Sequence, residues 1–230
     1  MPLPQLFMFH FAGGNCNSFN FLNPHLKDFS IETIELPGRG MRSDEILLTN
    51  FNLAALDLYK QLKEKLVSKE IVLYGHSMGA LFALKITKML EMDNIKPLYT
   101  VVSGNPGPGI KTNEGMYTLN DVEFIAQIKE LGGLPSEFLE NQELLDYFIP
   151  ILRADFELCE KNDLDSKSTV DTPIYSLMGD LEKHSKSIHN WSKYTNSSFK
   201  YEIQSGNHFF IYNSPEHISK IITNCYNSNK

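Results

Sequence analysis

The sequence predicts an α/β protein with a mostly parallel central sheet, flanking helices and a helical insertion. Short, nearly continuous apolar runs alternate with segments of helical periodicity, as in sheets covered on both faces. This order breaks at about residues 107–171, where amphipathic stretches follow one another with little strand character. For 230 residues, 42% of them hydrophobic, we expect one domain over residues 1–230, with the insertion as a lid over the ligand edge of the sheet.

The elements outside the insertion follow the alternation in order. We expect strands at residues 6–11, 31–36, 70–74, 98–105, 174–178 and 199–204. Helices are expected at residues 51–69 and 79–92, through Trp191, and after the Ser214–Pro215 pair, which can open a final helix. Inside the insertion, Asn120 can cap one helix and Gly132–Gly133 can end it.

Composition excludes several classes of protein. The net charge of −7 argues against a nucleic-acid-binding protein, which needs a basic face. No apolar run reaches the roughly 18 residues of a membrane span, so we expect no membrane partner. The first 14 residues lack the Lys or Arg that opens a signal peptide, so we interpret them as part of the folded protein. The three cysteines, Cys16, Cys159 and Cys225, show no metal or disulfide spacing, which favours a reducing, cytoplasmic location.

The segment "YGHSMGA" contains a Gly-x-Ser-x-Gly pattern at Gly75, Ser77 and Gly79. An apolar strand precedes it and a helix follows it, which is the context of a sharp strand-to-helix turn that exposes a nucleophilic serine. The start of the helix also supplies N–H groups and a dipole that favour an oxyanion. The sequence therefore predicts Ser77 as a nucleophile and the Met78 N–H as one oxyanion donor.

The base and the second oxyanion donor come from two other loops. His208, in "SGNHFFI", follows the last strand and is the late histidine that the chain order Ser, acid, His requires. His76 lies inside the turn, where its ring should point away from the Ser77 hydroxyl. The glycines of "HFAGG" let backbone approach a substrate, so Ala12 or Phe11 is expected to supply the second N–H donor.

Several ordered motifs together resemble the discrete type II thioesterases of nonribosomal peptide and polyketide synthetase systems, in the α/β-hydrolase superfamily. The similar segments are "FHFAGG", "ELPGRGMR", "YGHSMGA", "GNHFFI" and the lid signature "LGGLPSEFLENQELLDYFIPILRADFEL", and they span nearly the whole chain. The resemblance implies a monomeric serine thioesterase without cofactor or metal. Its partner would be an acyl or peptidyl carrier protein with a phosphopantetheine-bound acyl group, and its task the removal of stalled or aberrant acyl groups or the release of acyl chains.

The triad acid is the point at which the chain departs from this family. The family pattern places an aspartate three residues after a strand-end glycine, and here that position holds Glu182, whereas Asp180 directly follows Gly179. Position favours Glu182, and glutamate serves this role in some hydrolases of this fold. Asp180 remains an alternative, although it can instead stabilise its own turn. Asp155 is a third candidate, for which a structural pair with Arg153 or a backbone group is more natural.

Other residues leave alternatives open. The only three arginines, Arg39, Arg42 and Arg153, fall inside the motifs, where they can recognise phosphopantetheine or carrier acid groups or form structural pairs. His10 stands where the family usually has proline. Apolar lid residues can line an acyl channel or simply pack the lid, and they include Phe124, Leu131, Leu144 and Phe148. A carboxylesterase or lipase, or a catalytically inactive binding protein, are the alternative functions.

Overall fold

The structure is a computed structural model and describes residues 3–112, 114–132 and 141–229. Within these ranges the centre is a six-stranded sheet of order β2-β1-β3-β4-β5-β6, in which every neighbouring pair is parallel. The strands are β1 (Gln5–Phe9), β2 (Ser30–Ile34), β3 (Ile71–His76), β4 (Tyr99–Ser103), β5 (Ile174–Gly179) and β6 (Phe199–Gln204). The predicted α/β class with a parallel sheet is confirmed, and each strand boundary lies within two residues of its expected position.

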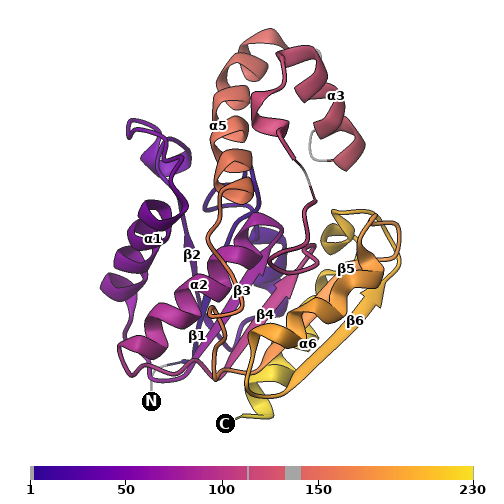
Figure 1. Cartoon of the computed structure of the whole chain (residues 1–230). Helices are drawn as coiled ribbons and strands as arrows, with labels where there is room; N and C mark the ends of the chain where they lie inside the picture. The colour runs from indigo at the N-terminus through magenta and orange to yellow at the C-terminus, as the bar shows by residue number, and fades with distance from the viewer. Residues whose placement is uncertain (1–2, 113, 133–140, 230) are drawn as a thin grey trace.

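Helices cover both faces of this sheet (Figure 1). They are α1 (Phe51–Lys65), α2 (Met78–Met92), α6 (Pro215–Asn227), and the 3-10 helices η1 (Asn20–His25), η2 (Gly40–Arg42), η4 (Ser185–Tyr194) and η5 (Phe210–Tyr212). Along β1, Phe7 and Phe9 join the apolar core beneath α1 and α2, whereas Leu6 and Met8 join the core beneath η1 and α6. Because side chains alternate along a strand, burial of both sets explains why β1 has no polar face.

The strand order places the carboxyl ends of β1 and β3 side by side at one edge. The chain goes from β1 outward to β2 and then back past β1 to β3, so the order reverses between β1 and β3. In open α/β sheets, ligands bind outside the carboxyl ends of the strands at such a reversal. Phe9 pairs with Gly75 and His76 with Ser103, which brings the loops after β1, β3 and β4 together at this point.

The insertion between β4 and β5 rises above this edge, at the end of the molecule away from both termini (Figure 1). Its described elements are η3 (Met116–Thr118), α3 (Asp121–Leu131) and α5 (Gln142–Glu160). As expected, the Asn120 side chain caps α3 by accepting a hydrogen bond from the Glu123 N–H, and Gly132 ends the helix at φ +72°. Gly133 and the rest of segment 133–140, which belong to the predicted lid signature, lie outside the described residues.

Two predicted helices differ from the observed ones for local reasons. The first ends at Lys65 instead of residue 69, because the Gln5 side chain accepts hydrogen bonds from the Val67 and Ser68 N–H groups and turns the chain. The one expected through Trp191 is the 3-10 helix η4. Its Ser, His and Asn residues favour local hydrogen bonding over a regular α-helix, and the Trp191 indole donates to the Asn105 carbonyl at 2.7 Å.

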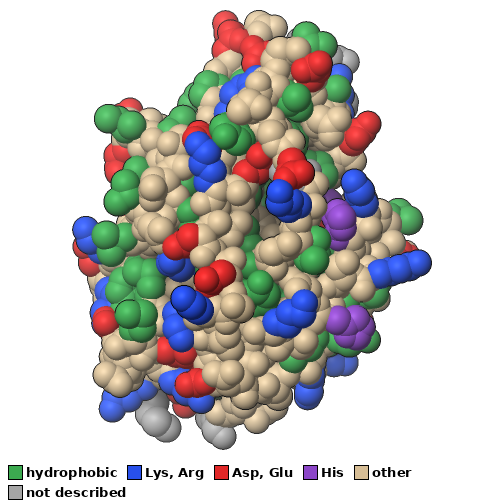
Figure 2. Space-filling view, viewed as in Figure 1, with side chains coloured by type: hydrophobic (Ala, Val, Ile, Leu, Met, Phe, Trp, Pro, Cys, Tyr) green, Lys and Arg blue, Asp and Glu red, His purple; other side chains and the backbone are tan. Residues whose placement is uncertain are grey.

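Acidic and basic side chains are interspersed over the face shown in Figure 2, around a hollow below the lid. No helix among the described residues is long and apolar enough to cross a membrane.

The packing of α2 against the end of β1 can be tested at Gly79, where the two elements approach closely through backbone atoms. A Cβ at Gly79 would lie 1.9 Å from the Phe9 carbonyl oxygen, which is backbone and cannot swing aside. We expect Gly79→Ala to lower the free energy of unfolding by roughly 3 kcal/mol, measured by urea denaturation, because overpacked cores must shift backbone. Met92→Ala, at a residue of the same helix that is 74% exposed, should change it by less than about 0.5 kcal/mol. Equal stability of the two variants would contradict this packing.

Candidate active site

Ser77 occupies a strained turn between β3 and α2. Its φ and ψ are +57° and −114°, and Ser77 and Asn94 are the only non-glycine residues with positive φ in the described part of the chain. The Ser77 N–H donates to the Ser103 carbonyl at 2.8 Å, which anchors the turn to β4. Glycine at position 75 is needed because a Cβ there would lie 2.1 Å from the Gly79 carbonyl oxygen. Such strain persists only where the surrounding structure holds it.

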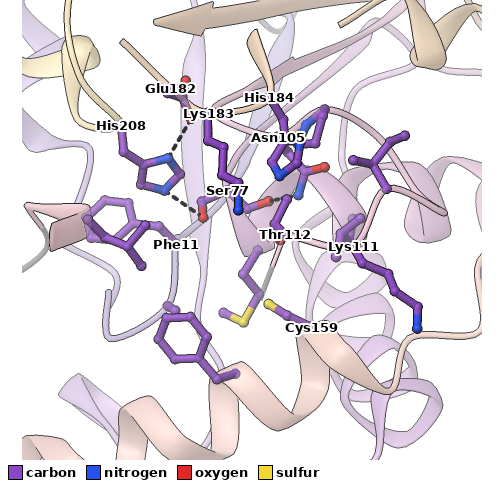
Figure 3. A pocket seen from close by; sticks show the side chains of 18 of the residues that line it. Phe11, Ser77, Asn105, Lys111, Thr112, Cys159, Glu182, Lys183, His184 and His208 are labelled. Atoms are coloured by element: carbon purple, nitrogen blue, oxygen red, sulfur yellow. Dashed lines mark hydrogen bonds and ion pairs between the residues drawn. The ribbon is translucent and has the colours of Figure 1, made fainter. Parts of the chain in front are cut away.

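The Ser77 hydroxyl is the first member of a hydrogen-bonded chain (Figure 3). Its Oγ lies 2.9 Å from His208 Nε2, and His208 Nδ1 lies 2.7 Å from Glu182 Oε2. Because a carboxylate can only accept, Nδ1 carries the proton and Nε2 is free to accept from the serine. The other Glu182 oxygen accepts from the Gly179 N–H at 2.8 Å, which folds the longer glutamate side chain back toward the sheet and fixes its carboxylate.

Glu182 and His208 meet because β5 and β6 are neighbours and their loops touch. A Cβ at Gly179 would lie 2.4 Å from the Gly206 carbonyl oxygen, so the two loops are in direct backbone contact. Gly206 adopts φ +134°, a conformation that other residues rarely take, immediately before the segment that carries His208.

The structure does not bring the two alternative acids to His208. Asp180 is exposed, and its Oδ1 accepts from the Gly206 N–H at 2.8 Å. Asp155 is fully buried and bonds Arg39 and the Gly13 N–H. Of the two partners expected for Asp155, a backbone group is confirmed by the bond from the Gly13 N–H. The other, Arg153, is wrong, since Arg153 bonds Asp121 of α3.

The two predicted oxyanion donors line the same cavity as Ser77. Met78 is the first residue of α2, where an N–H has no acceptor within the helix. The Phe11 carbonyl accepts from the Gly14 N–H and from His10 Nδ1, each at 2.9 Å. The Phe11 carbonyl and the Ala12 N–H belong to one trans peptide and point in opposite directions. The two bonds to the carbonyl therefore fix the direction of the Ala12 N–H, which has no partner among the described residues.

His10, at the position where the family usually has proline, is buried and connects two loops through its ring nitrogens. Its Nε2 accepts from the Leu36 N–H at 3.3 Å, so Nδ1 holds the proton that goes to the Phe11 carbonyl. Burial, and secondarily the Arg39 guanidinium, lower the pKa of His10 to about 4. The ring therefore stays uncharged near neutral pH, and it ties the end of β1 to the loop after β2.

His76 lies behind His208, with ring centroids 5.1 Å apart. Its Nδ1 contacts the Ser103 hydroxyl at 2.8 Å, away from Ser77, as its place in the turn predicted. Burial, and then the proximity of His208, lower the pKa of His76 well below its usual value. A neutral ring at this place adds no charge repulsion when His208 takes up a proton.

A cavity of about 740 Å³ opens beside Ser77 and extends under the lid (Figure 3). The loop after β4 forms one wall, and residues of α3 and α5 form another. Of the lid residues predicted to line a channel, Leu131 does so, whereas Phe124 packs with Phe156 between α3 and α5. Cys159 also lines the cavity, and burial raises the pKa of its thiol, which disfavours the reactive thiolate.

All three arginines form pairs within the chain. Arg39 bonds Asp155, Arg42 bonds Asp57 and Glu45, and Arg153 bonds Asp121 and the Tyr117 carbonyl. Of the two interpretations of their positions, the structure shows structural pairing.

Sequence reasoning missed Asn105, which follows β4. Its amide donates to the Ser77 carbonyl at 3.1 Å, and its oxygen accepts from the Gly107 N–H at 2.8 Å. It thus ties the nucleophile turn to the wall of the cavity. The sequence feature that could have indicated this role is an asparagine at the end of a strand, directly before "PGPG". Asparagine side chains often form hydrogen bonds with the backbone of such turns. No group of three or more metal-binding side chains occurs in the ranges that the structure describes.

The parallel sheet, the strained serine turn and the late histidine define an α/β-hydrolase fold. The model of the thioesterase domain family matches residues 4–226, and the chain belongs to this family of thioester hydrolases. Linear gramicidin dehydrogenase LgrE of Brevibacillus parabrevis is 30% identical over 225 residues, which cover 94% of this chain and 85% of that protein. Its name describes a dehydrogenase, whereas the family model describes a thioesterase.

Two solved structures are similar over nearly their whole length. YbtT, a type II thioesterase from the yersiniabactin NRPS/PKS biosynthetic pathway, is 27% identical with a TM-score of 0.88, and the match covers 99% of this chain and 94% of that one. ClbQ, from the colibactin NRPS/PKS pathway, is 25% identical with a TM-score of 0.91, and 98% of each chain is covered. The predicted resemblance to type II thioesterases is confirmed.

The buried neutral His10 predicts a pH dependence of stability. Its pKa is 6.5 in the unfolded chain and about 4 in the folded one, so the unfolded state binds more protons between these values. Stability is therefore lost as the pH falls through 6.5 toward 4. We expect the loss between pH 7 and pH 5, measured by urea unfolding, to be about 2 kcal/mol smaller in His10→Gln than in the wild type. Parallel pH curves for the two proteins would contradict a neutral buried His10.

Proposed function

We propose that the chain is a serine thioesterase that hydrolyses acyl thioesters on the phosphopantetheine arm of carrier proteins. In this proposal Ser77 is the nucleophile, His208 the general base and Glu182 the acid that orients it. The observation that carries the proposal is the hydrogen-bonded order Ser77–His208–Glu182 at the wall of the 740 Å³ cavity. The family and the two NRPS/PKS relatives support the thioester chemistry and the carrier substrate.

The first half of the reaction transfers the acyl group to the enzyme. Ser77 Oγ attacks the thioester carbonyl carbon while His208 Nε2 takes the hydroxyl proton. The N–H groups of Met78 and Ala12 stabilise the oxyanion of the tetrahedral intermediate. The C–S bond then breaks, the proton passes from His208 to the leaving sulfur, and the carrier departs with a free thiol.

The second half regenerates the serine. Water enters the place of the thiol, His208 removes a proton from it, and the resulting hydroxide attacks the acyl-serine carbonyl. Collapse of the second tetrahedral intermediate breaks the C–O bond and returns the proton to Ser77, which releases a free acid. Glu182 stabilises the imidazolium in both halves without taking its proton.

The cavity and its opening fit an acyl group delivered on an arm. The acyl chain can extend beneath the lid past Leu131, Leu152 and Phe156, while the arm reaches Ser77 from the protein surface. The biological task we propose is removal of stalled or aberrant acyl groups from carriers, or release of acyl chains. A monomeric state and a cytoplasmic location, expected from the sequence, stay predictions.

The two carboxylates after β5 give a matched pair of variants. Glu182→Gln replaces the acceptor of His208 Nδ1 by a neutral amide, and we expect kcat to fall on the order of 10⁴, as when the triad acid of other serine hydrolases becomes an amide. Asp180→Asn keeps an oxygen for the Gly206 N–H and should lower kcat less than about tenfold. Steady-state hydrolysis of an acyl thioester measures both. Similar losses in the two variants would argue against Glu182 as the acid.

The substrate class is tested with one acyl group on three carriers. We expect kcat/KM to be highest for an acyl carrier protein, lower for the acyl-CoA and lowest for the p-nitrophenyl ester, because only the carrier offers a protein surface as well as the arm. Ser77→Ala should abolish turnover of all three. Preference for the simple ester would indicate a carboxylesterase, and full activity of Ser77→Ala would refute the serine mechanism. Absence of wild-type activity on all three would favour an inactive binding protein.

A further inference from the structure

Asp155 lies on α5, where this lid helix reaches the loop after β1. Its Oδ1 accepts from Arg39 Nη2 at 2.8 Å, and its Oδ2 accepts from Arg39 Nη1 at 2.5 Å and from the Gly13 N–H at 2.8 Å. Asp155 is fully buried and Arg39 is 2% exposed. The network thus joins three segments far apart in the sequence: α5, the "PGRG" loop and the turn that contains Ala12.

A buried ion pair of this kind is poorly explained by stability alone. Removing two charges from water costs several kcal/mol, and apolar pairs of similar volume are often as stable. What such a pair does provide is a fixed geometry, since Arg39 holds both carboxylate oxygens in one plane. The third hydrogen bond, which Asp155 accepts from the Gly13 N–H, shows that the fixed carboxylate holds the turn after β1.

Gly13 follows Ala12 in the turn that the bond from the Gly14 N–H to the Phe11 carbonyl closes. It adopts φ +76°, which only glycine takes readily, and a Cβ there would lie 2.7 Å from Leu152 Cδ2. The peptide before Ala12 is fixed by the bonds of His10 and Gly14 to the Phe11 carbonyl. The peptide after Ala12 is fixed by Asp155 through the Gly13 N–H. Without Asp155, the turn through Ala12 and Gly13 loses its bond to α5. The turn can then shift relative to α2, and the Phe11–Ala12 peptide that carries the Ala12 N–H shifts with it.

We propose that Asp155 is a positioning residue for the oxyanion site: through the Gly13 N–H it holds the turn in which the Ala12 N–H faces the substrate carbonyl. The proposal rests on the function proposed above, because it assigns Ala12 as an oxyanion donor. Asp155 neither bonds His208 nor lines the cavity beside Ser77. Arg39 serves to hold Asp155.

Two double variants separate the hydrogen bond to Gly13 from the ion pair. Arg39→Met/Asp155→Leu removes both charges and the acceptor of the Gly13 N–H while keeping the volume. Arg39→Gln/Asp155→Asn also removes both charges but leaves an amide oxygen opposite Gly13. With an acyl carrier substrate, we expect the Met/Leu variant to lose roughly ten- to hundredfold in kcat with KM within about threefold, and the Gln/Asn variant to stay within about threefold of wild-type kcat.

Three further readouts distinguish positioning from a merely structural role. An alkyl boronic acid, which forms a tetrahedral adduct with a serine and places an oxygen in the oxyanion site, should bind the Met/Leu variant more weakly by the same factor as kcat falls. The inflection of the kcat/KM–pH profile should stay at its wild-type position, because the His208–Glu182 pair is unchanged. Arg42→Met/Asp57→Leu, which removes an ion pair of the same loop without contact to Gly13, should leave kcat within about threefold.

Each other outcome overturns the proposal. Wild-type kcat in a folded Met/Leu variant, equal losses in both double variants, or a fall in kcat without weaker boronate binding would show that the Gly13 bond does not set the oxyanion site. A shifted pH inflection would show that the Arg39–Asp155 pair acts on the His208–Glu182 pair and not on the oxyanion site. Activity in Ser77→Ala, run in the same assay, would refute the proposed serine mechanism and is distinguishable from these results.

Should the Met/Leu variant show no cooperative thermal transition, a backbone change decides the question. Replacement of Gly13 by glycolic acid turns its N–H into an ester oxygen and leaves every side chain in place. Since Cys16 follows three residues later, this chain can be assembled by ligating a synthetic segment 1–15 to an expressed segment 16–230. We expect the same ten- to hundredfold loss in kcat relative to an all-amide ligated control, and equal kcat would overturn the proposal.

Discussion

The strained turn at Ser77 is the constraint on which the rest of the structure depends. A serine at φ +57° is tolerated only because Gly75 and Gly79 leave no side chains to clash and because β1 and β4 hold the turn from both sides. The same packing sets the start of α2 beneath the hydroxyl and brings the loop after β1 to within reach of it. The packing of the core of the sheet therefore sets the positions of both the proposed nucleophile and the proposed oxyanion donors.

A second feature of the site is that the buried ionisable groups His10, His76 and Asp155 are neutral or paired. His10 and His76 are buried and uncharged, and the carboxylate of Asp155 is held by Arg39. In the proposed reaction, the developing charge is stabilised by the N–H groups of Met78 and Ala12 and by Glu182. Low local dielectric makes each of these arranged contacts count for more.

Much of this was predictable from sequence because it is local. Apolar runs and helical periodicity predicted the strands and the fold class, and the Gly75-to-Gly79 pattern predicted the strained strand-to-helix turn at Ser77. The choice between Glu182 and Asp180 was not local: both follow β5, and only the contact of the β5 and β6 loops decides which carboxylate faces His208. The charged partner of Asp155 was not local either, since Arg39 lies 116 positions away and meets it only through the tertiary fold.

The central claim, that Ser77 attacks an acyl group delivered by a carrier protein, is tested most directly by covalent capture. A carrier protein whose phosphopantetheine arm ends in a fluorophosphonate offers phosphorus where the thioester carbon would lie. We expect the wild type to form a one-to-one adduct through Ser77 Oγ, with fluoride leaving and the hydroxyl proton passing to His208, and peptide mass spectrometry should place it on Ser77. Failure of this carrier to react, while a small free fluorophosphonate labels Ser77, would contradict delivery by a carrier; attachment at any other residue would contradict the nucleophile.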